Sequence, residues 1–117
     1  MTNLRNRGYV LTESSRDVAN IIIQQMGGTG RLNAMIGAKN FVFHHDLEGG
    51  VSFKFMKSSL KGAPNYIKIT LNGKDLYNLE FGYIRGSKYK VVKKIDDVFA
   101  EDLRPIFKRQ TGLDLHL

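Results

Sequence analysis

Two stretches near the middle of the chain have the hydrophobic alternation of a β-hairpin. Apolar and polar residues alternate through Ile67–Asn72 and again through Tyr77–Tyr83. A period of two is typical of strands that bury one face. Asn72–Gly73 between them is a strong turn signal. The apolar residues of the two strands lie on the same face of the sheet only if the loop between the strands has an odd number of residues. Asn72–Lys74, with Gly73 in the left-handed conformation, would be such a loop.

Further strands are predicted on either side of this hairpin. Phe41–His45 and Val51–Met56 flank the turn-like segment Asp46–Gly50, which indicates a second hairpin whose aromatic residues belong mainly to the core. The short apolar segment Leu32–Ile36 is also predicted to be a strand. Lysines crowd Lys88–Ile95, as is typical of an edge strand that resists pairing with other molecules.

The two ends of this region have helical periodicity. Ser14–Gln25 predicts a helix with Ser14 as N-cap, ended by Gly27–Gly28. Asp96–Thr111 predicts a second helix, capped by Asp96 or Asp97 and ended by Gly112. Pro105 lies inside this second pattern and is expected to kink the helix or to mark a restart near Asp102.

The order of these elements predicts an α+β fold. Successive hairpins imply an antiparallel sheet of about five to six strands, with an N-terminal and a C-terminal helix packed on one face. We expect residues 1–117 to form a single domain, in which residues 1–12 are a basic, flexible arm or a short edge strand.

The composition restricts the classes of function. The chain has no cysteine, which excludes disulfides, thiolate metal sites and a cysteine nucleophile, and agrees with a reducing cytoplasm. Neither a signal peptide nor a membrane span is predicted, so we expect no membrane partner. The formal net charge of +7 indicates either an acidic partner or a surface that is basic only for solubility.

Motifs for catalysis or cofactor binding are weak. GGTGR at Gly27–Arg31 follows a predicted helix and leads toward a predicted strand, so it is a helix end and turn rather than a phosphate loop. His44 and His45 are adjacent on a strand, which directs them to opposite faces, one toward the core and one toward solvent, and His116 is distant. We therefore expect no metal site, no cofactor, no catalytic residues and no enzymatic activity.

Basic residues are the main candidates for a binding site. A positive sheet face and an adjoining loop would follow a phosphate backbone by charge and shape, with no base-reading motif in the chain. The candidate nucleic-acid-binding residues are Lys54, Lys57, Lys61, Lys68, Arg85, Lys88, Lys90, Lys93 and Lys94. Bases could stack on any outward-facing member of the set Tyr66, Tyr77, Tyr83 and Tyr89.

Several segments resemble a family of small proteins encoded by bacteriophages and mobile elements. The resemblance lies in GGTGRLNAMIGAKNF at Gly27–Phe41, in IKITLNGKDLYNLEFGYIRG at Ile67–Gly86, in the following YKVV, and in AEDLRPIFKRQTGL at Ala100–Leu113. It covers most of the chain from about Gln24 onward. It implies the cytoplasm of a bacterial host and a role in phage DNA metabolism or counter-defence, but it brings no site residues. Pro105 departs from the uninterrupted helix expected of that family.

Two functions therefore remain open. The first is a non-enzymatic accessory protein that binds nucleic acid. The second is an inhibitor or adaptor, of the anti-CRISPR kind, that binds an acidic surface of a host protein. Outward tyrosines among lysines favour nucleic acid, whereas an exposed patch of Leu, Ile or Phe favours a protein partner or a homodimer.

Overall fold

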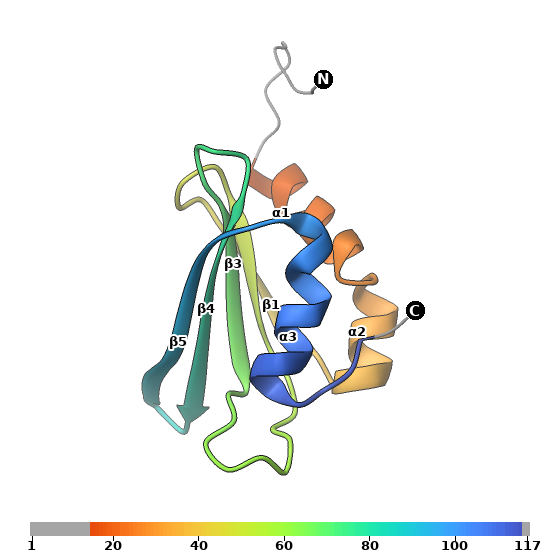
Figure 1. Ribbon diagram of the computed structural model, residues 1–117, viewed down its shortest axis with the longest axis vertical. Coiled ribbons are helices and arrows are strands. Elements are labelled where there is room, and N and C mark those ends of the chain that lie inside the picture. Colours follow the sequence, from red (N-terminus) through yellow and green to blue (C-terminus); the bar gives the residue numbers. More distant parts are fainter. Residues whose placement is uncertain (1–14, 116–117) are drawn as a thin grey trace.

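The computed structural model describes residues 15–115 as three α-helices packed on one face of a five-stranded antiparallel sheet (Figure 1). The sheet is a meander in which every strand lies beside its neighbours in sequence. The predicted α+β class and the helix-covered face are confirmed. The elements are α1 (Ser15–Gln25), α2 (Thr29–Ile36), β1 (Lys39–His44), β2 (Gly50–Lys54), β3 (Tyr66–Leu71), β4 (Tyr77–Arg85), β5 (Lys88–Val98), the 3-10 helix η1 (Ala100–Asp102) and α3 (Leu103–Thr111).

The segment predicted as a sixth strand is helix α2. Leu32 and Ile36 lie four positions apart, both are buried, and this spacing places them on one helical face. Gly28 ends α1 by donating its N–H to Ile23 O at 2.9 Å and also stands directly before α2. The prediction of a strand here was wrong, as was the view that these glycines lead toward one, because a short apolar run does not distinguish a strand from a helix.

The central hairpin has an odd loop, as predicted, but the loop is longer than expected. Leu71 lies opposite Tyr77, which leaves five residues in the loop. Ile69 therefore lies opposite Leu79, whereas the three-residue loop Asn72–Lys74 would have placed it opposite Tyr77. The shift is two residues, so both apolar sets still face the helices. The left-handed loop residue is Asp75 at φ 60°, not Gly73.

Strand β5 extends further than the sequence indicated. It continues through Asp96 and Asp97, which were predicted to cap a helix and instead form a β-bulge opposite Asn78 of β4. Asp97 has φ 59°, an uncommon conformation for a residue other than glycine. These two carboxylates therefore belong to the sheet.

Helix α3 begins after this bulge, with Pro105 in its first turn. Backbone N–H groups in a first turn have no partner within the helix, so proline costs no hydrogen bond there. The predicted restart near Asp102 is thus confirmed. Gly112, at φ 78°, ends the helix as predicted and donates its N–H to Lys108 O at 2.8 Å.

The core lies between the three helices and the apolar face of the sheet. The ring centroid of Phe107, on α3, lies 5.0 Å from that of Phe55 and 6.4 Å from that of Phe81. Such aromatic pairs contribute stability beyond the area that they bury. The fully buried large side chains are Phe53, Phe81, Phe107, Ile22, Met26, Leu32, Ile36, Ile67, Ile69, Leu79, Leu103 and Leu115. The three helices leave the opposite face of the sheet uncovered (Figure 1), and we call it the open face.

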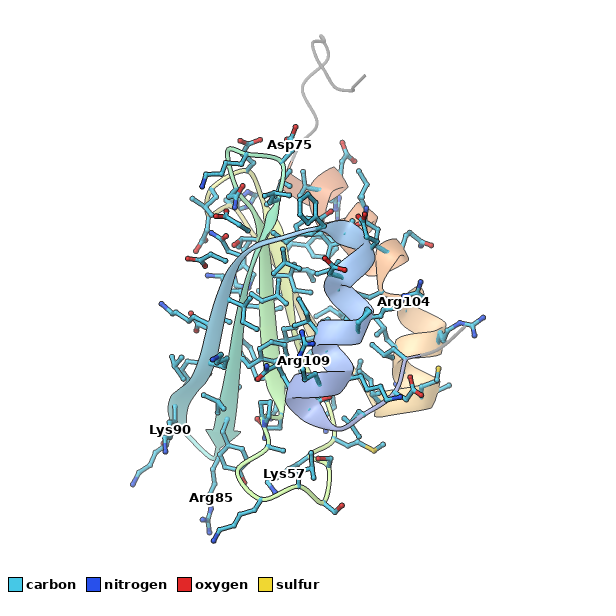
Figure 2. The ribbon with its side chains drawn as sticks, viewed as in Figure 1. Lys57, Asp75, Arg85, Lys90, Arg104 and Arg109 are labelled. Carbon is cyan, nitrogen blue, oxygen red and sulfur yellow. The ribbon has the colours of Figure 1, made fainter. Side chains whose placement is uncertain are left out.

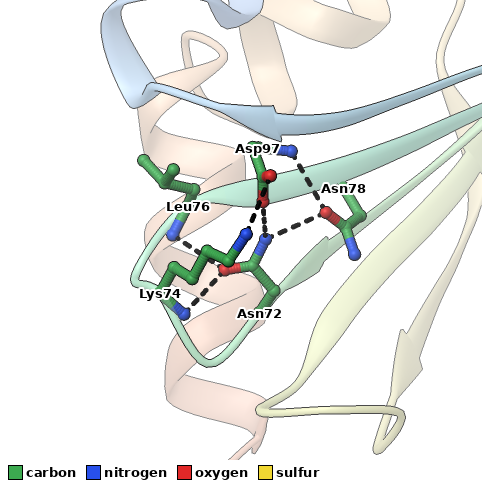
Figure 3. Close-up of polar contacts among 5 residues, drawn as sticks. All are labelled: Asn72, Lys74, Leu76, Asn78 and Asp97. Atoms are coloured by element: carbon green, nitrogen blue, oxygen red, sulfur yellow. Dashed lines mark hydrogen bonds and ion pairs between the residues drawn. The ribbon is translucent and has the colours of Figure 1, made fainter.

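A polar network holds the far end of the β3–β4 hairpin (Figure 3). The Asn72 side chain, only 8% exposed, accepts N–H bonds from Lys74 and Leu76 at 2.9 and 3.2 Å. Its amide donates to Asn78 Oδ1 and to Asp97 Oδ1, each at 2.9 Å. One side chain therefore fixes both the loop and the β5 bulge.

Substituting Asn72→Ala is expected to lower the free energy of unfolding by about 2 to 3 kcal/mol, because it leaves several partly buried polar groups without partners. Chemical denaturation monitored by circular dichroism would measure the loss. Asn20→Ala, on the exposed face of α1, is the matched control and should stay within about 0.5 kcal/mol of the wild type. Equal stability of the two variants would contradict the proposed role of the network.

Candidate nucleic-acid interface

Two stretches of the chain contain cations and no acidic residue. Residues 49–74 hold five lysines, and residues 81–95 hold four lysines and one arginine. The antiparallel pairing brings parts of both stretches to one end of the sheet, where the β2–β3 loop and the β4–β5 hairpin lie. Figure 2 shows Lys57, Arg85 and Lys90 at this end and Asp75 at the other. We call this end the basic tip and define it by Lys57, Lys61, Arg85, Lys88 and Lys90.

The tip side chains are exposed and are not neutralised within the described chain. All five are solvent-exposed, and among residues 15–115 none of them forms an ion pair. Lys57 Nζ donates to the backbone oxygen of Leu60 at 3.3 Å. Their positive charge is therefore available to an outside partner.

The β4–β5 hairpin fixes the positions of three tip cations. Arg85 lies directly opposite Lys88, and Gly86–Ser87, with Gly86 at φ 62°, forms the two-residue turn between them. Lys90 lies opposite Tyr83. Like charges directly opposite each other destabilise a strand pair, so an anion bound between Arg85 and Lys88 would relieve repulsion that the folded chain carries alone.

The β2–β3 loop, which carries Lys57 and Lys61, is tied to the same hairpin. The Asn65 side chain donates to Ile84 O at 2.9 Å and accepts from Ile84 N at 2.8 Å. On the other side, Leu60 packs so closely on Gly112 that a Cβ at Gly112 would lie 2.6 Å from its Cδ1. These contacts hold the loop against both β4 and α3, so the loop and hairpin cations form one surface.

The sequence predicts that the basic residues of the strands lie on one face of the sheet, but in the structure they lie on both faces. Lys68 and Lys94 lie on the open face on either side of Glu80. The bulge between Val91 and Lys93 reverses the alternation of β5, so Lys88 and Lys90 project from the opposite face to Lys94. The prediction that the basic strand residues share one sheet face is therefore wrong. Arg85 follows the alternation of Leu79 and Phe81 and projects from the helix-bearing side, and the β5 bulge, which alternation alone does not reveal, places Lys88 and Lys90 on that side too.

The remaining predicted cations differ in their electrostatic setting. Lys68 pairs with Asp46 at 2.6 Å, and this hydrogen bond lowers the pKa of the Asp46 carboxyl. Lys94 lies 3.7 Å from Glu80. Lys54 is half-buried on the open face, and Lys93 is exposed opposite Phe81 on the other face. The structure thus brings five of the nine candidates together at the tip and places two of the others beside acids.

Two of the four candidate tyrosines lie on the open face. Tyr66 and Tyr89 meet edge to face, with ring centroids 5.3 Å apart and an interplanar angle of 77°. The Tyr89 hydroxyl donates to Glu80 Oε2 at 2.6 Å, and burial, together with this hydrogen bond, raises the pKa of Tyr89. Tyr77 is buried and bonds to Gln25, whereas Tyr83 is half-buried on the helix-bearing side of β4.

The histidine pair also differs from the prediction, because neither residue enters the core. His44 is half-buried, with Nε2 2.7 Å from Ser52 Oγ, and His45 is exposed beyond the end of β1. His116 lies outside the described residues. Across residues 15–115, no three His, Cys, Asp or Glu side chains come together in a way that could hold a metal ion.

The pKa of His44 lies below its ordinary value of 6.5, mainly because of burial and then because of the positive charge of Lys68. The unfolded chain therefore takes up a proton more readily than the folded chain. Stability conferred by neutral His44 is complete above pH 6.5 and declines as the pH falls below that value.

We expect the free energy of unfolding of the wild type to exceed that of His44→Gln by more at about pH 7.5 than at about pH 5.5. Denaturant titrations of both proteins at the two pH values would measure this difference. A difference that stays constant with pH would show that His44 does not contribute to the pH dependence.

Within the described part of the chain, no helix is long and apolar enough to cross a membrane. No family model, no curated protein and no solved structure matches this chain. The resemblance to phage-encoded proteins therefore stays a prediction.

Proposed function

We propose that this protein is a non-enzymatic accessory factor that binds nucleic acid through the basic tip, in a cell that hosts a phage or mobile element. The observation that supports this proposal is the cluster of five exposed cations, unpaired among the described residues, at one end of the fold. Contacts of lysine and arginine with phosphates supply affinity that does not depend on sequence.

The distribution of acidic residues supports the same orientation of binding. The β1–β2 turn carries Asp46 and Glu48, and the β3–β4 loop carries Asp75, both at the end opposite the tip. The two turns are neighbours, since a Cβ at Gly73 would lie 3.8 Å from Glu48 Oε2. The field of such a molecule turns its basic end toward a polyanion and its acidic end away from it.

The shape of the tip favours contacts with the backbone of the nucleic acid over reading of base pairs. Its lysines and arginine are spread over the end of a hairpin and an irregular loop, and contacts of such side chains with phosphates position a protein on nucleic acid without reading its sequence. The proposed mode is therefore recognition of charge and shape.

A second candidate is an inhibitor or adaptor that binds an acidic surface of a host protein. Tyr89, Val91 and Val92 on edge strand β5 are 44%, 44% and 40% exposed, which supports a protein contact there. A partner strand could also pair with the free edge of β5. This candidate predicts a stable complex with one protein and little affinity for oligonucleotides.

Fluorescence anisotropy of labelled single-stranded and double-stranded oligonucleotides tests the first proposal. We expect micromolar or tighter binding at low salt, with an affinity that falls linearly on a double-logarithmic plot against salt concentration. The double variant Arg85→Gln/Lys88→Gln should bind more weakly, with a salt slope smaller by roughly 1 to 2, because it loses two phosphate contacts.

The double variant Lys74→Gln/Arg104→Gln is the matched control. It removes the same charge from the β3–β4 loop and from α3, away from the tip (Figure 2). It should keep most of the affinity and nearly the wild-type slope. Equal losses in the two double variants would mean that only net charge matters, and absence of binding at low salt would reject the function in favour of a protein partner.

A further inference from the structure

The open face carries an exposed aromatic ring that its neighbours hold in place. Tyr89 on β5 reaches across strand β4, where its ring lies over Gly82. A Cβ at Gly82 would lie 2.3 Å from Tyr89 Cε1, so only glycine leaves room for the ring. Tyr89 is nevertheless 44% exposed, so part of the ring remains available to solvent.

Two further contacts fix the orientation of the ring. Tyr66 packs against it at 77°, and the Tyr89 hydroxyl donates to Glu80 Oε2 at 2.6 Å. Rotation of the Tyr89 side chain is therefore restricted by Gly82 below the ring, by the ring of Tyr66 beside it and by the carboxylate of Glu80 at its hydroxyl. A side chain that is already ordered loses little conformational entropy when a ligand binds to it.

Cations lie near this ring on both faces of the sheet. Lys54 is directly opposite Tyr66 on the open face, and no ion pair to it exists within the described residues. Lys88 and Lys90 are the neighbours of Tyr89 in edge strand β5 and belong to the basic tip, but they project from the helix-bearing side of the sheet. A polyanion that passes from the tip around the edge of β5 onto the open face would therefore meet Lys88 and Lys90 before the ring and Lys54 beyond it.

We propose that Tyr89 is a stacking platform for an unpaired base, so that the nucleic acid bound by this protein is single-stranded. This inference rests on the proposed function and adds the class of nucleic acid to it. A base inside a duplex is covered on both faces by its neighbours, whereas a base of a single strand can place one face on an aromatic side chain. Stacking of a base on an aromatic ring is possible for both single-stranded DNA and single-stranded RNA, because every base has a π-face.

The test compares four labelled probes of equal length by fluorescence anisotropy at one salt concentration. These are a single DNA strand, the corresponding RNA strand, a DNA duplex and a DNA strand in which the bases are replaced by abasic sites. The wild type should bind at least one of the base-containing single strands more tightly than the abasic strand. The tighter of the DNA and RNA strands identifies the polymer.

Three substitutions distinguish the contribution of the Tyr89 ring to binding from the contributions of the groups around it. Tyr89→Leu should weaken binding of the base-containing strand roughly 5- to 150-fold, the range expected for loss of one stacked base, and leave the abasic strand unaffected. Tyr89→Phe retains the ring and should stay close to the wild type. Gly82→Ala retains every charge and the ring but displaces it, and should lower affinity for the base-containing strand alone. Thermal unfolding of each variant confirms that it is folded at the temperature of the titration.

The outcomes distinguish this inference from the proposed function. If wild type and Tyr89→Leu bind all four probes equally well, the platform is overturned and the basic tip remains as the binding site. If no probe binds at low salt, both the platform and the nucleic-acid function are overturned. A loss that is equal for the base-containing and abasic strands in Tyr89→Leu also counts against stacking, because the abasic strand offers no base.

Discussion

The architecture depends on the alternation in β3 and β4, which makes only one face of the sheet apolar. Ile67, Ile69, Leu79 and Phe81 all point to the same side and are buried there. Because only that face offers hydrophobic surface, all three helices pack on it, with Phe107 against Phe55 and Phe81. The same alternation leaves the other face with polar and aromatic side chains in contact with solvent. The open face is thus a direct consequence of how the core forms.

The meander topology places the acidic turns at one end of the sheet and the basic turns at the other. Acidic residues fall in the β1–β2 turn, in the β3–β4 loop and in the β5 bulge beside that loop, whereas all charged residues of the β2–β3 loop and of residues 81–95 in the β4–β5 hairpin are cations. In an antiparallel meander, alternate turns lie at opposite ends of the sheet. The molecule therefore acquires one basic and one acidic end without any long-range rearrangement. Electrostatic interactions of this kind orient a protein as it approaches a charged partner.

Much of the fold could be predicted from local patterns, and the exceptions have identifiable physical causes. Helix α1, the central hairpin, the edge position of β5 and the end of α3 at Gly112 follow from periodicity and glycine. Helix α2 was missed because its apolar run, Leu32–Ile36, is too short for its period to distinguish a helix from a strand. The five-residue loop, left-handed Asp75 and the bulge at Asp97 depend on hydrogen bonds from Asn72, which join residues up to 25 positions apart. The candidate cations were identified, but the bulge at Val91–Lys93 divides them between two faces and so changes the site.

The basic end combines several features that do not favour stability. Arg85 and Lys88 face each other with like charge. Gly82 lies inside a strand, where glycine is entropically unfavourable. Tyr89, Val91 and Val92 expose apolar surface on an edge strand that could pair with other chains. At the opposite end, the Asn72 network satisfies its polar groups and Lys74 pairs with Asp97 at 3.2 Å. Binding of the proposed polyanion would relieve the repulsion between the cations and cover the exposed ring, so a single ligand would account for both the charge and the aromatic surface of the basic end. A surface that was basic only for solubility would need neither the glycine beneath Tyr89 nor the tyrosine beside it.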